Sequence, residues 1–529
     1  MAARHGNWVG LGLWVLLSSA PATAADPSVA TPSFEITRFA IEGNSLLTEQ
    51  EVAERTSAFT GKGRTFADVQ LALDSLQQAY RERGWGAVSV ILPEQELKDG
   101  VVRLRVVEGR IRKVTIAGAQ HRDDANTRRA VPALQEGQTP NLDALARNLQ
   151  LANENPTRQL AVTMRTGQQE GDVEADVEVT DRNPSRFFLS ADNSGTNETG
   201  RYRVGAGYQH ANLFDRDHVA TVQWITSPEE MSDVNIFGAG YRIPIYAWDG
   251  MFDVFAGYSD VDSGTVQGLF NVSGKGTVAG ARYTQFLKRL GTGFEHRLSA
   301  GLDWRKFDND LQLVGGSAQL LPDYTVRPVS LTYSGTWRQA QTRVGFYGGF
   351  YQNISGGSNG GDADFNAVRF GADADYNLWR YGFDGAVDVY RDWQARVNFM
   401  GQYTDDLLVP GEQFGIGGAN SVRGFLEREL SNDRGYSAQF EVYTPNFAPL
   451  LNAADWQIRA LTFYDMGYNR RNDPLPGEIA RESISSAGLG IRLGYGDLNI
   501  RFDWARVLQP GGTQGNNDDR IHAAVGYIF

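Results

Sequence analysis

The residue types that carry out chemistry are sparse in this chain and do not form a catalytic constellation. The 529 residues include no cysteine, which excludes a disulfide framework, a zinc–thiolate site and a cysteine nucleophile. The six histidines are scattered, without a His-x-x-x-His pair, and there is no Gly-x-Ser-x-Gly elbow. We therefore expect no catalytic residue, no metal site and no cofactor.

One arginine among small residues marks the most informative segment of the sequence. Val422, Arg423, Gly424 and Phe425 follow a glycine-rich stretch within a connection that we place at about 409–434. This connection is long for a turn between two strands. Arg423 is either an ordinary solvent-facing loop residue or the cation that fixes the loop, and the spacing leaves both interpretations open.

A second motif, on a predicted strand, offers this arginine a partner. Phe463, Asp465 and Gly467 lie at every second position, so they share one face of an extended strand. If that face points into the lumen of a barrel, Asp465 is a carboxylate that requires a cation. An Arg423–Asp465 fork would then hold the loop inside the pore.

In the segments that must position these residues, apolar and polar residues alternate with a period of two. From about Ser185 the helical period is lost, and about sixteen alternating segments lie between Phe187 and Phe529. In the segment 498–504 the even positions are apolar and the odd positions are polar or charged. A soluble β-sandwich also alternates, but a barrel with lipid outside and water inside requires this alternation. We therefore predict an all-β membrane barrel of 16 antiparallel strands at 185–529.

Composition and the last strand agree with this prediction. The chain has 60 glycines, 11% aromatic residues and a net charge of -13, and this acidity argues against a partner that is a nucleic acid. The segment 521–529 ends on Tyr527 and Phe529. A terminal Phe after alternating apolar residues resembles the signal that the barrel-assembly machinery reads. The predicted environment is outer-membrane lipid.

Two small α+β modules precede the barrel. Each has the order β-α-α-β-β, and we place the first at 34–109 and the second at 110–182. In the first, Thr48 and Glu51 form a capping box, and one helix carries an apolar stripe from Phe66 to Tyr80 at spacings of three and four. Exposed edge strands in such modules can accept an extended peptide. The alternative is that the modules are only spacers.

The N-terminal residues predict export from the cytoplasm. Arg4 precedes an apolar run and then small residues at Ala20, Ala22 and Ala24, which is the pattern of a signal peptide at 1–24. A short linker, 25–33, joins it to the first module. No later stretch is long and apolar enough for a transmembrane helix.

Several motifs together resemble a known family. The Val422–Phe425 loop and the Phe463, Asp465, Gly467 strand resemble the outer membrane protein 85 superfamily, and the two modules resemble polypeptide-transport-associated (POTRA) domains. The first module is similar to that of two-partner secretion transporters, the exporters of haemolysins and filamentous haemagglutinins. The residues that carry this likeness are Tyr80, Gly84, Leu92, Pro93, Gln95, Leu97, Val107, Glu108 and Gly109.

The resemblance implies a transporter in the outer membrane of a Gram-negative bacterium, with its POTRA domains in the periplasm. It would bind one large secreted exoprotein there and pass it through the barrel without nucleotide, with Arg423 and Asp465 positioning the loop. Some members carry an N-terminal plug helix, and 25–33 is too short for one, so we expect the loop alone to gate the channel. The alternative within the superfamily is an assembly factor for outer-membrane proteins.

Overall fold

The computed structural model describes residues 32–197, 199–261, 264–266, 270–272, 275–291, 293–309 and 321–529. The predicted signal peptide and linker residues 25–31 lie outside these ranges. Among the described residues, no helix has both the length and the apolar character needed to span a membrane. The chain divides into two compact units, Met1–Ala79 with Val90–Val106 and Tyr80–Ser89 with Val107–Phe529.

The first module is a small sheet with two helices. Strand β2 runs parallel to β5, and β4 completes the order β2-β5-β4. The capping box of α1 is present, because Thr48 accepts from the Glu51 amide and Glu51 accepts from the Thr48 amide. The elements are β1 (Phe34–Ile36), β2 (Arg38–Glu42), α1 (Glu49–Thr56), η1 (Ser57–Phe59), β3 (Gly61–Arg64), α2 (Phe66–Glu82), β4 (Val88–Ile91) and β5 (Val101–Glu108).

Two details of this module differ from the sequence prediction. The first strand is broken at Thr37, and its initial part, β1, pairs with the unpredicted strand β3. On α2 the buried residues include Val69, Leu76 and Tyr80, whereas Phe66 is 62% exposed. Phe66 is the first residue of the helix, and the stripe that packs on the sheet begins one turn later.

The second module repeats this arrangement. Its sheet has the order β6-β8-β7, with β6 parallel to β8, and its helices bury one apolar stripe that includes Leu145 and Leu151. The elements are β6 (Arg110–Ala117), α3 (Asp124–Ala130), α4 (Leu142–Ala152), β7 (Arg158–Thr166) and β8 (Asp172–Asp181).

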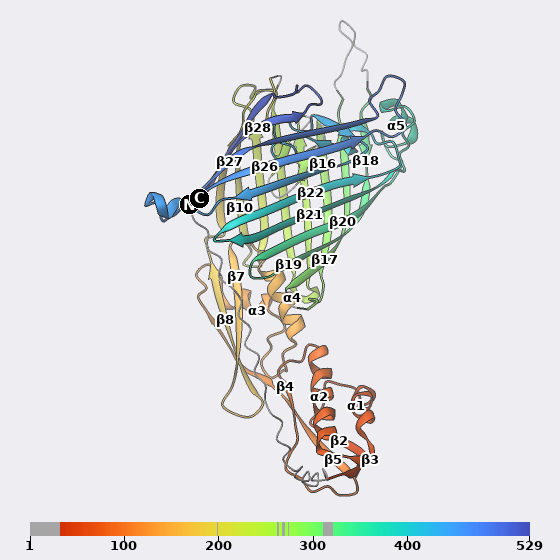
Figure 1. The fold of residues 1–529 in the computed structure, drawn as a ribbon, viewed down its shortest axis with the longest axis vertical. Helices are drawn as coiled ribbons and strands as arrows, with labels where there is room; N and C mark the ends of the chain where they lie inside the picture. The colour runs from red at the N-terminus through yellow and green to blue at the C-terminus, as the bar shows by residue number, and fades with distance from the viewer. Residues whose placement is uncertain are drawn as a thin grey trace, which may run out of the picture. The chain divides into compact units, whose positions relative to one another are not determined.

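A closed antiparallel barrel forms the rest of the chain (Figure 1). Strands β18 and β19 follow each other along β17 and make one strand of the wall, so the described residues give sixteen. The wall consists of β9 (Ser185–Asp192), β10 (Arg203–Leu213), β11 (His218–Thr226), β12 (Asn235–Ile245), β13 (Gly250–Ser259), β16 (Gly276–Phe286), β17 (Phe294–Phe307), β18 (Tyr324–Val326), β19 (Pro328–Arg338), β20 (Thr342–Asn353), β21 (Asn377–Tyr390), β22 (Trp393–Tyr403), β25 (Arg434–Tyr443), β26 (Trp456–Arg470), β27 (Arg481–Tyr495), β28 (Leu498–Gln509) and β29 (Asp519–Ile528).

The wall closes where the last strand meets the first. Residues 524–528 of β29 pair with 192–188 of β9, and the amide of Phe529 donates to the Phe187 carbonyl at 2.8 Å. The predicted barrel of 16 antiparallel strands is therefore confirmed. Smaller elements in its connections are η2 (Tyr246–Trp248), β14 (Gly264–Val266), β15 (Phe270–Val272), α5 (Asp362–Val368), η3 (Pro410–Glu412), β23 (Phe414–Ile416), β24 (Leu430–Asn432) and η4 (Ala448–Leu451).

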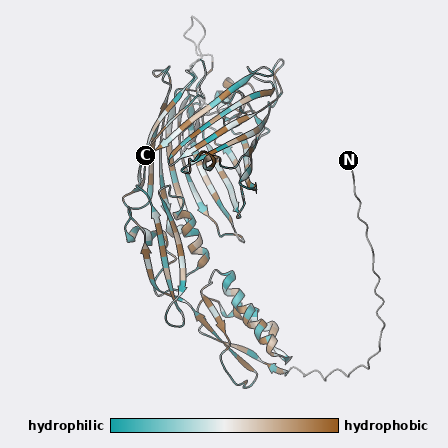
Figure 2. Ribbon diagram, turned by 60° about the vertical axis from the view of Figure 1, so that its left-hand side comes forward, coloured by the Kyte–Doolittle hydropathy of each residue, from teal (hydrophilic) through white to brown (hydrophobic). Residues whose placement is uncertain are grey.

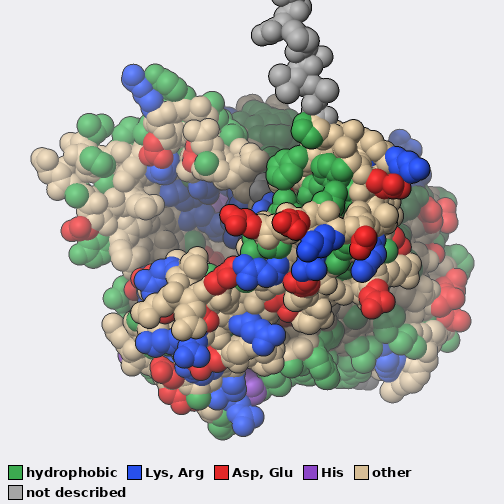
Figure 3. Space-filling model, turned by 90° about the horizontal axis from the view of Figure 1, so that it is seen from below, with side chains coloured by type: hydrophobic (Ala, Val, Ile, Leu, Met, Phe, Trp, Pro, Cys, Tyr) green, Lys and Arg blue, Asp and Glu red, His purple; other side chains and the backbone are tan. Residues whose placement is uncertain are grey.

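The two faces of the wall differ as the alternation predicts. On β28, Phe502 is 40% exposed on the outside, whereas its neighbour Asp503 is fully buried on the inside. Hydrophobic and hydrophilic positions alternate along the strands (Figure 2). Seen from below, the surface of the molecule carries basic and acidic side chains next to one another (Figure 3).

A buried carboxylate joins the second module to the barrel. Asp217, in the turn between β10 and β11, accepts from Arg122 Nε at 3.0 Å and from Arg158 Nη1 at 2.6 Å. Both guanidinium groups belong to the second module, and both are fully buried. Tyr246, in η2, donates to Asp217 at 2.9 Å. Burial raises the pKa of the Tyr246 phenol, so the phenol keeps the proton that it donates.

A second carboxylate, in the turn between β12 and β13, also binds the second module. Asp249 accepts from Arg147 Nε at 2.6 Å and from Asn148 Nδ2 at 2.7 Å, and both donors lie on α4. Two turns of the barrel thus bind the second module through charge-assisted hydrogen bonds. The module is therefore a fixed part of this end of the barrel.

Replacing Asp217 with Asn should loosen the second module without unfolding the barrel. The buried guanidinium of Arg158 would lose its carboxylate partner, which costs about 3–5 kcal/mol, while Arg122 would keep Asp181 at 3.6 Å. We expect faster limited proteolysis within 107–182, while the barrel keeps its heat-modifiable migration on gels. Asp176→Asn is the matched control, because its pair with Arg165 is solvent-exposed and such pairs contribute about 1 kcal/mol or less. Unchanged proteolysis of the Asp217 variant would contradict this assignment.

Candidate functional site

The connection between β22 and β25 folds back into the barrel. It spans 404–433, beginning earlier than the predicted 409–434, and Arg434 already belongs to β25. Residues 407–409 are apolar, and Leu408 and Val409 are buried in a cluster with residues of other connections and of strands β17, β18 and β21. Within the connection, β23 and β24 pair as a short antiparallel hairpin, and residues 417–429 form its tip.

The tip carries Arg423 into contact with Asp465 on β26. Arg423 Nε donates to Asp465 Oδ2 at 2.7 Å, and Nη2 donates to Oδ1 at 2.8 Å. The backbone amide of Arg423 adds a third hydrogen bond to Oδ2 at 3.0 Å. Arg423 is 1% exposed and Asp465 is fully buried. This is a bidentate fork in the interior of the barrel, and bidentate charged pairs are among the strongest hydrogen-bonded contacts.

Further groups of the wall surround the same guanidinium. Arg423 Nη1 donates to Glu441 Oε1 at 2.8 Å and lies 3.6 Å from Asp503 Oδ1. The guanidinium carbon lies 3.5 Å from the centre of the Phe463 ring, so the ring covers one face of the cation. His522 Nε2 accepts from the Gly424 amide at 3.0 Å. The loop tip thus contacts four strands of the wall, β25, β26, β28 and β29, and β27 lies between the two pairs.

Two glycines allow this close approach. Gly424 has φ +97°, a left-handed conformation that favours glycine. At Gly467 a Cβ would lie 2.8 Å from Ile416 Cδ1 and 3.0 Å from Val422 Cγ2, so a side chain there would push the loop away from the wall. Val422 and Phe425 are fully buried and pack with Ile416 in an apolar cluster.

The start of the loop has its own anchor. Glu412 is 1% exposed and accepts from Arg305 Nη1 at 2.8 Å and from Arg380 Nη2 at 3.1 Å. These arginines lie on β17 and β21, on the other side of β22 from the tip's partners. Gln402 donates to the Glu412 carbonyl at 3.0 Å, which also fixes the backbone.

A third anchor holds the end of the loop. Asp433 is fully buried and receives both terminal nitrogens of Arg369, which follows α5 in the connection between β20 and β21. It also accepts from the amides of Leu408 at 2.9 Å and Asn472 at 2.7 Å. Three connections therefore meet at this carboxylate, at the end of the barrel where α5 lies (Figure 1).

The structure brings together seven residues that the sequence singled out: Val422, Arg423, Gly424, Phe425, Phe463, Asp465 and Gly467. Tyr527 and Phe529 lie elsewhere, on the outside of the closing strand, 41% and 61% exposed, with their ring centres 4.6 Å apart.

Sequence reasoning missed the other partners of the loop. Glu441, Asp503 and His522 occupy inward positions of alternating strands, so the strand pattern marks them as facing the lumen but does not name their partner. Glu412 and Asp433 carry no motif, and their partners Arg305, Arg380 and Arg369 come from distant strands and loops.

Breaking the fork should expose the loop tip. Because the chain has no cysteine, one cysteine introduced at Ser421, which is 8% exposed, reports the accessibility of the tip to a maleimide. Arg423→Ala and Asp465→Ala should each speed labelling. Arg423→Ala leaves the buried carboxylate of Asp465 without its cation at a cost of about 3–5 kcal/mol, whereas Asp465→Ala breaks the fork but leaves Arg423 bonded to Glu441, so its effect should be smaller. The double variant should label no faster than the faster single variant, because the two groups act as one unit.

The control for this experiment is Arg506→Ala. Arg506 pairs with Asp519 at 2.8 Å, but both side chains are exposed, so the labelling rate should stay at the parent value. Additive effects of the Arg423 and Asp465 changes would show that the pair does not hold the tip.

Comparisons with known proteins show the family of this chain. The sequence model of the family described as haemolysin secretion/activation protein ShlB/FhaC/HecB matches residues 171–493, and that of the ShlB-type POTRA domain matches 34–109. Outer membrane transporter CdiB of Dickeya dadantii (strain 3937) is 24% identical over 469 residues, 83% of this chain and 75% of CdiB. Heme/hemopexin transporter protein HuxB of Haemophilus influenzae is 21% identical over 501 residues, 90% of this chain and 83% of HuxB.

A solved structure shares the fold. CdiB from Escherichia coli aligns with a TM-score of 0.74 and 18% identity, covering 96% of this chain and 93% of that chain. The family match alone extends over more than half of the sequence. The protein therefore belongs to the ShlB/FhaC/HecB family of haemolysin secretion/activation proteins, the two-partner secretion transporters of the outer membrane.

Proposed function

We propose that this protein binds one large exoprotein in the periplasm through its POTRA domains and exports it through the barrel. The observation that carries this proposal is the loop inside the lumen. Its three ionic anchors, at Glu412, Arg423 and Asp433, are non-covalent, so the loop can be displaced and can return. A permanent plug would need no such releasable contacts.

The modules suit the capture of an extended chain. In the second module β7 (Arg158–Thr166) is at one edge of the sheet β6-β8-β7, and in the first module β4 is at the edge of β2-β5-β4. An edge strand presents backbone amides and carbonyls that can pair with an added strand. The fixed contact between the second module and the barrel would keep a captured chain near the periplasmic mouth.

The direction of export would come from the exoprotein itself. The periplasm holds no ATP, and the family is one of transporters. Folding of the exoprotein outside the cell would prevent its return. In this scheme Arg423 and Asp465 position the loop, residues 1–24 direct export of the transporter, 25–33 link to the first POTRA domain, and Tyr527 and Phe529 are read by the barrel-assembly machinery before insertion into lipid.

A comparison of culture supernatants tests the proposal. The parent strain, a deletion, Arg423→Ala and the exposed control Arg506→Ala are compared by proteomics under conditions where the transporter is made. We expect one large protein to disappear in the deletion and to fall about tenfold or more in Arg423→Ala, since a buried charge pair contributes several kcal/mol. Arg506→Ala should secrete normally.

The outer-membrane fractions of the same strains separate this function from its alternative. If the supernatants do not differ while other outer-membrane proteins are depleted in the deletion, the protein is an assembly factor. If neither the supernatant proteins nor the outer-membrane proteins change, export of a protein partner is excluded under these conditions.

A further inference from the structure

A polar cavity of about 670 Å³ lies in the lumen beneath the loop tip. Its lining includes Asn420 and Arg423 of the tip and the turn 339–341 between β19 and β20. This turn is at the same end of the barrel as the turns that carry Asp217 and Asp249, which is the periplasmic end. The cavity is therefore the space that a chain coming from the periplasm meets before the loop.

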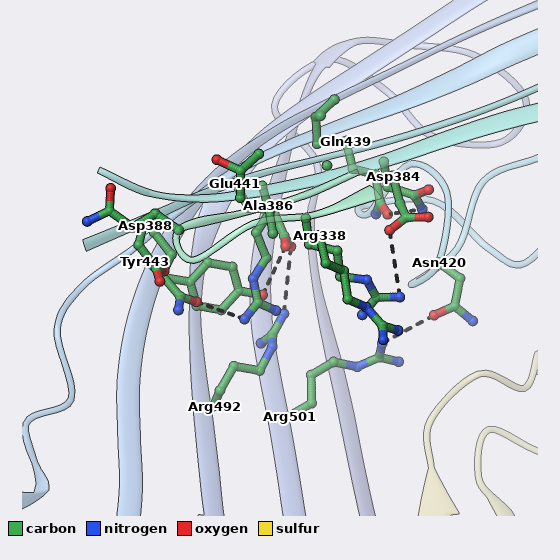
Figure 4. Close-up of a pocket in the computed structure, with 18 of the residues that line it drawn as sticks. Arg338, Asp384, Ala386, Asp388, Asn420, Gln439, Glu441, Tyr443, Arg492 and Arg501 are labelled. Atoms are coloured by element: carbon green, nitrogen blue, oxygen red, sulfur yellow. Dashed lines mark hydrogen bonds and ion pairs between the residues drawn. The ribbon is translucent and has the colours of Figure 1, made fainter. Parts of the chain in front are cut away.

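Arginine dominates the charge of this cavity. Six arginines and three carboxylates line it, and Figure 4 shows three members of each set: Arg338, Arg492, Arg501, Asp384, Asp388 and Glu441. Two of the six have carboxylate partners from the wall, since Arg423 bonds to Asp465 and Arg492 bonds to Asp503 at 2.8 and 3.0 Å.

Three of the remaining arginines have only neutral close partners or none. Arg501 donates to the Asn420 side chain at 3.2 Å. Arg396 donates to Gln394 at 2.9 Å, and its guanidinium lies 4.3 Å from the Tyr443 ring centre. Within the part of the chain that the structure describes, Arg338, Arg396 and Arg501 have no carboxylate oxygen within 4.0 Å.

The carboxylates near the cavity make no close ion pair with these three guanidinium groups. Glu441 already accepts from Arg423, and Asp384 lies 4.0 Å from Arg343. Asp388 also lines the cavity, and Glu427 of the loop tip interacts electrostatically with Arg501. Because the wall has a low dielectric constant, three guanidinium groups that lack a close carboxylate partner produce a positive potential in their part of the hollow. The protein as a whole has a net charge of -13, so this potential is a local property of the lumen.

We propose that the cavity binds the carboxylates of an acidic, extended segment of the exported protein. The planar guanidinium matches a carboxylate in a two-pronged hydrogen bond, and Tyr443 keeps that of Arg396 oriented. A segment bound here lies directly against Asn420 and Arg423, so its carboxylates compete with Asn420 for Arg501 and reach the base of the loop tip. This inference rests on the proposed function, because it supplies the chemistry by which the exported chain is received.

Peptide binding to the full-length protein in nanodiscs tests the inference. The probe is a short fluorescent peptide of alternating Glu and Gly, and its anisotropy is followed at low ionic strength. The parent should bind it, and added salt should weaken binding. The triple variant Arg338→Gln, Arg396→Gln, Arg501→Gln should bind the peptide at least about tenfold more weakly than the parent, because three charge contacts are lost.

Two further variants control for charge and folding. Arg506→Gln removes an arginine outside the cavity and should bind like the parent, whereas Asp384→Asn with Asp388→Asn should bind more tightly. Each single arginine variant should show part of the loss, which keeps the test valid if the triple variant misfolds on heat-modifiability gels. Equal binding by the parent and the triple variant, or equal binding of a Lys–Gly peptide by the parent, would overturn the inference.

The result of the peptide-binding experiment can be distinguished from the result of the secretion assay. Peptide binding with the expected variant pattern supports the site even in a strain whose supernatant shows no cargo. A strain that secretes its cargo while its transporter does not bind the acidic peptide retains the proposed function and removes this inference.

Discussion

The buried fork between Arg423 and Asp465 is the contact on which the interior of this barrel depends. A sixteen-stranded wall encloses more space than its own inward side chains can fill, and here a loop occupies part of it. A loop in such a place must satisfy its backbone and its charges from the wall. Arg423 does this by bonding Asp465 with its side chain and its own amide, while the backbone of Gly424 bonds His522.

Residues of the wall leave space for this loop and bind it at several positions. Gly467 leaves the space that Ile416 and Val422 occupy, and a small apolar cluster seals the tip. Glu412 and Asp433 fix the two ends of the loop to other strands and connections. Most of the holding contacts are ionic, which gives the loop one defined position and still allows release when a competing charge or a moving strand removes a partner.

Two sets of arginines in this protein have different consequences. Those at the junction with the second module, Arg122 and Arg158, are buried and share Asp217, so they fix structure. Those beneath the loop tip, such as Arg338 and Arg501, have no carboxylate oxygen of a described residue within 4.0 Å and line the cavity. The first group makes the second module and the barrel one unit, and the second group gives the lumen a charge that the composition of the chain does not reveal.

The sequence by itself determined the alternation of the strands, the two β-α-α-β-β modules and the motifs that contain Arg423 and Asp465, because each depends on residues close together in the chain. A period of two separates the two faces of a strand, and it was sufficient to place Asp465 on the same face as Phe463 and Gly467. Only the tertiary structure decided that Glu412 meets Arg305 and that Asp433 meets Arg369. Those pairs depend on closure of the barrel and on the register of every strand between the partners, which a local repeat does not specify.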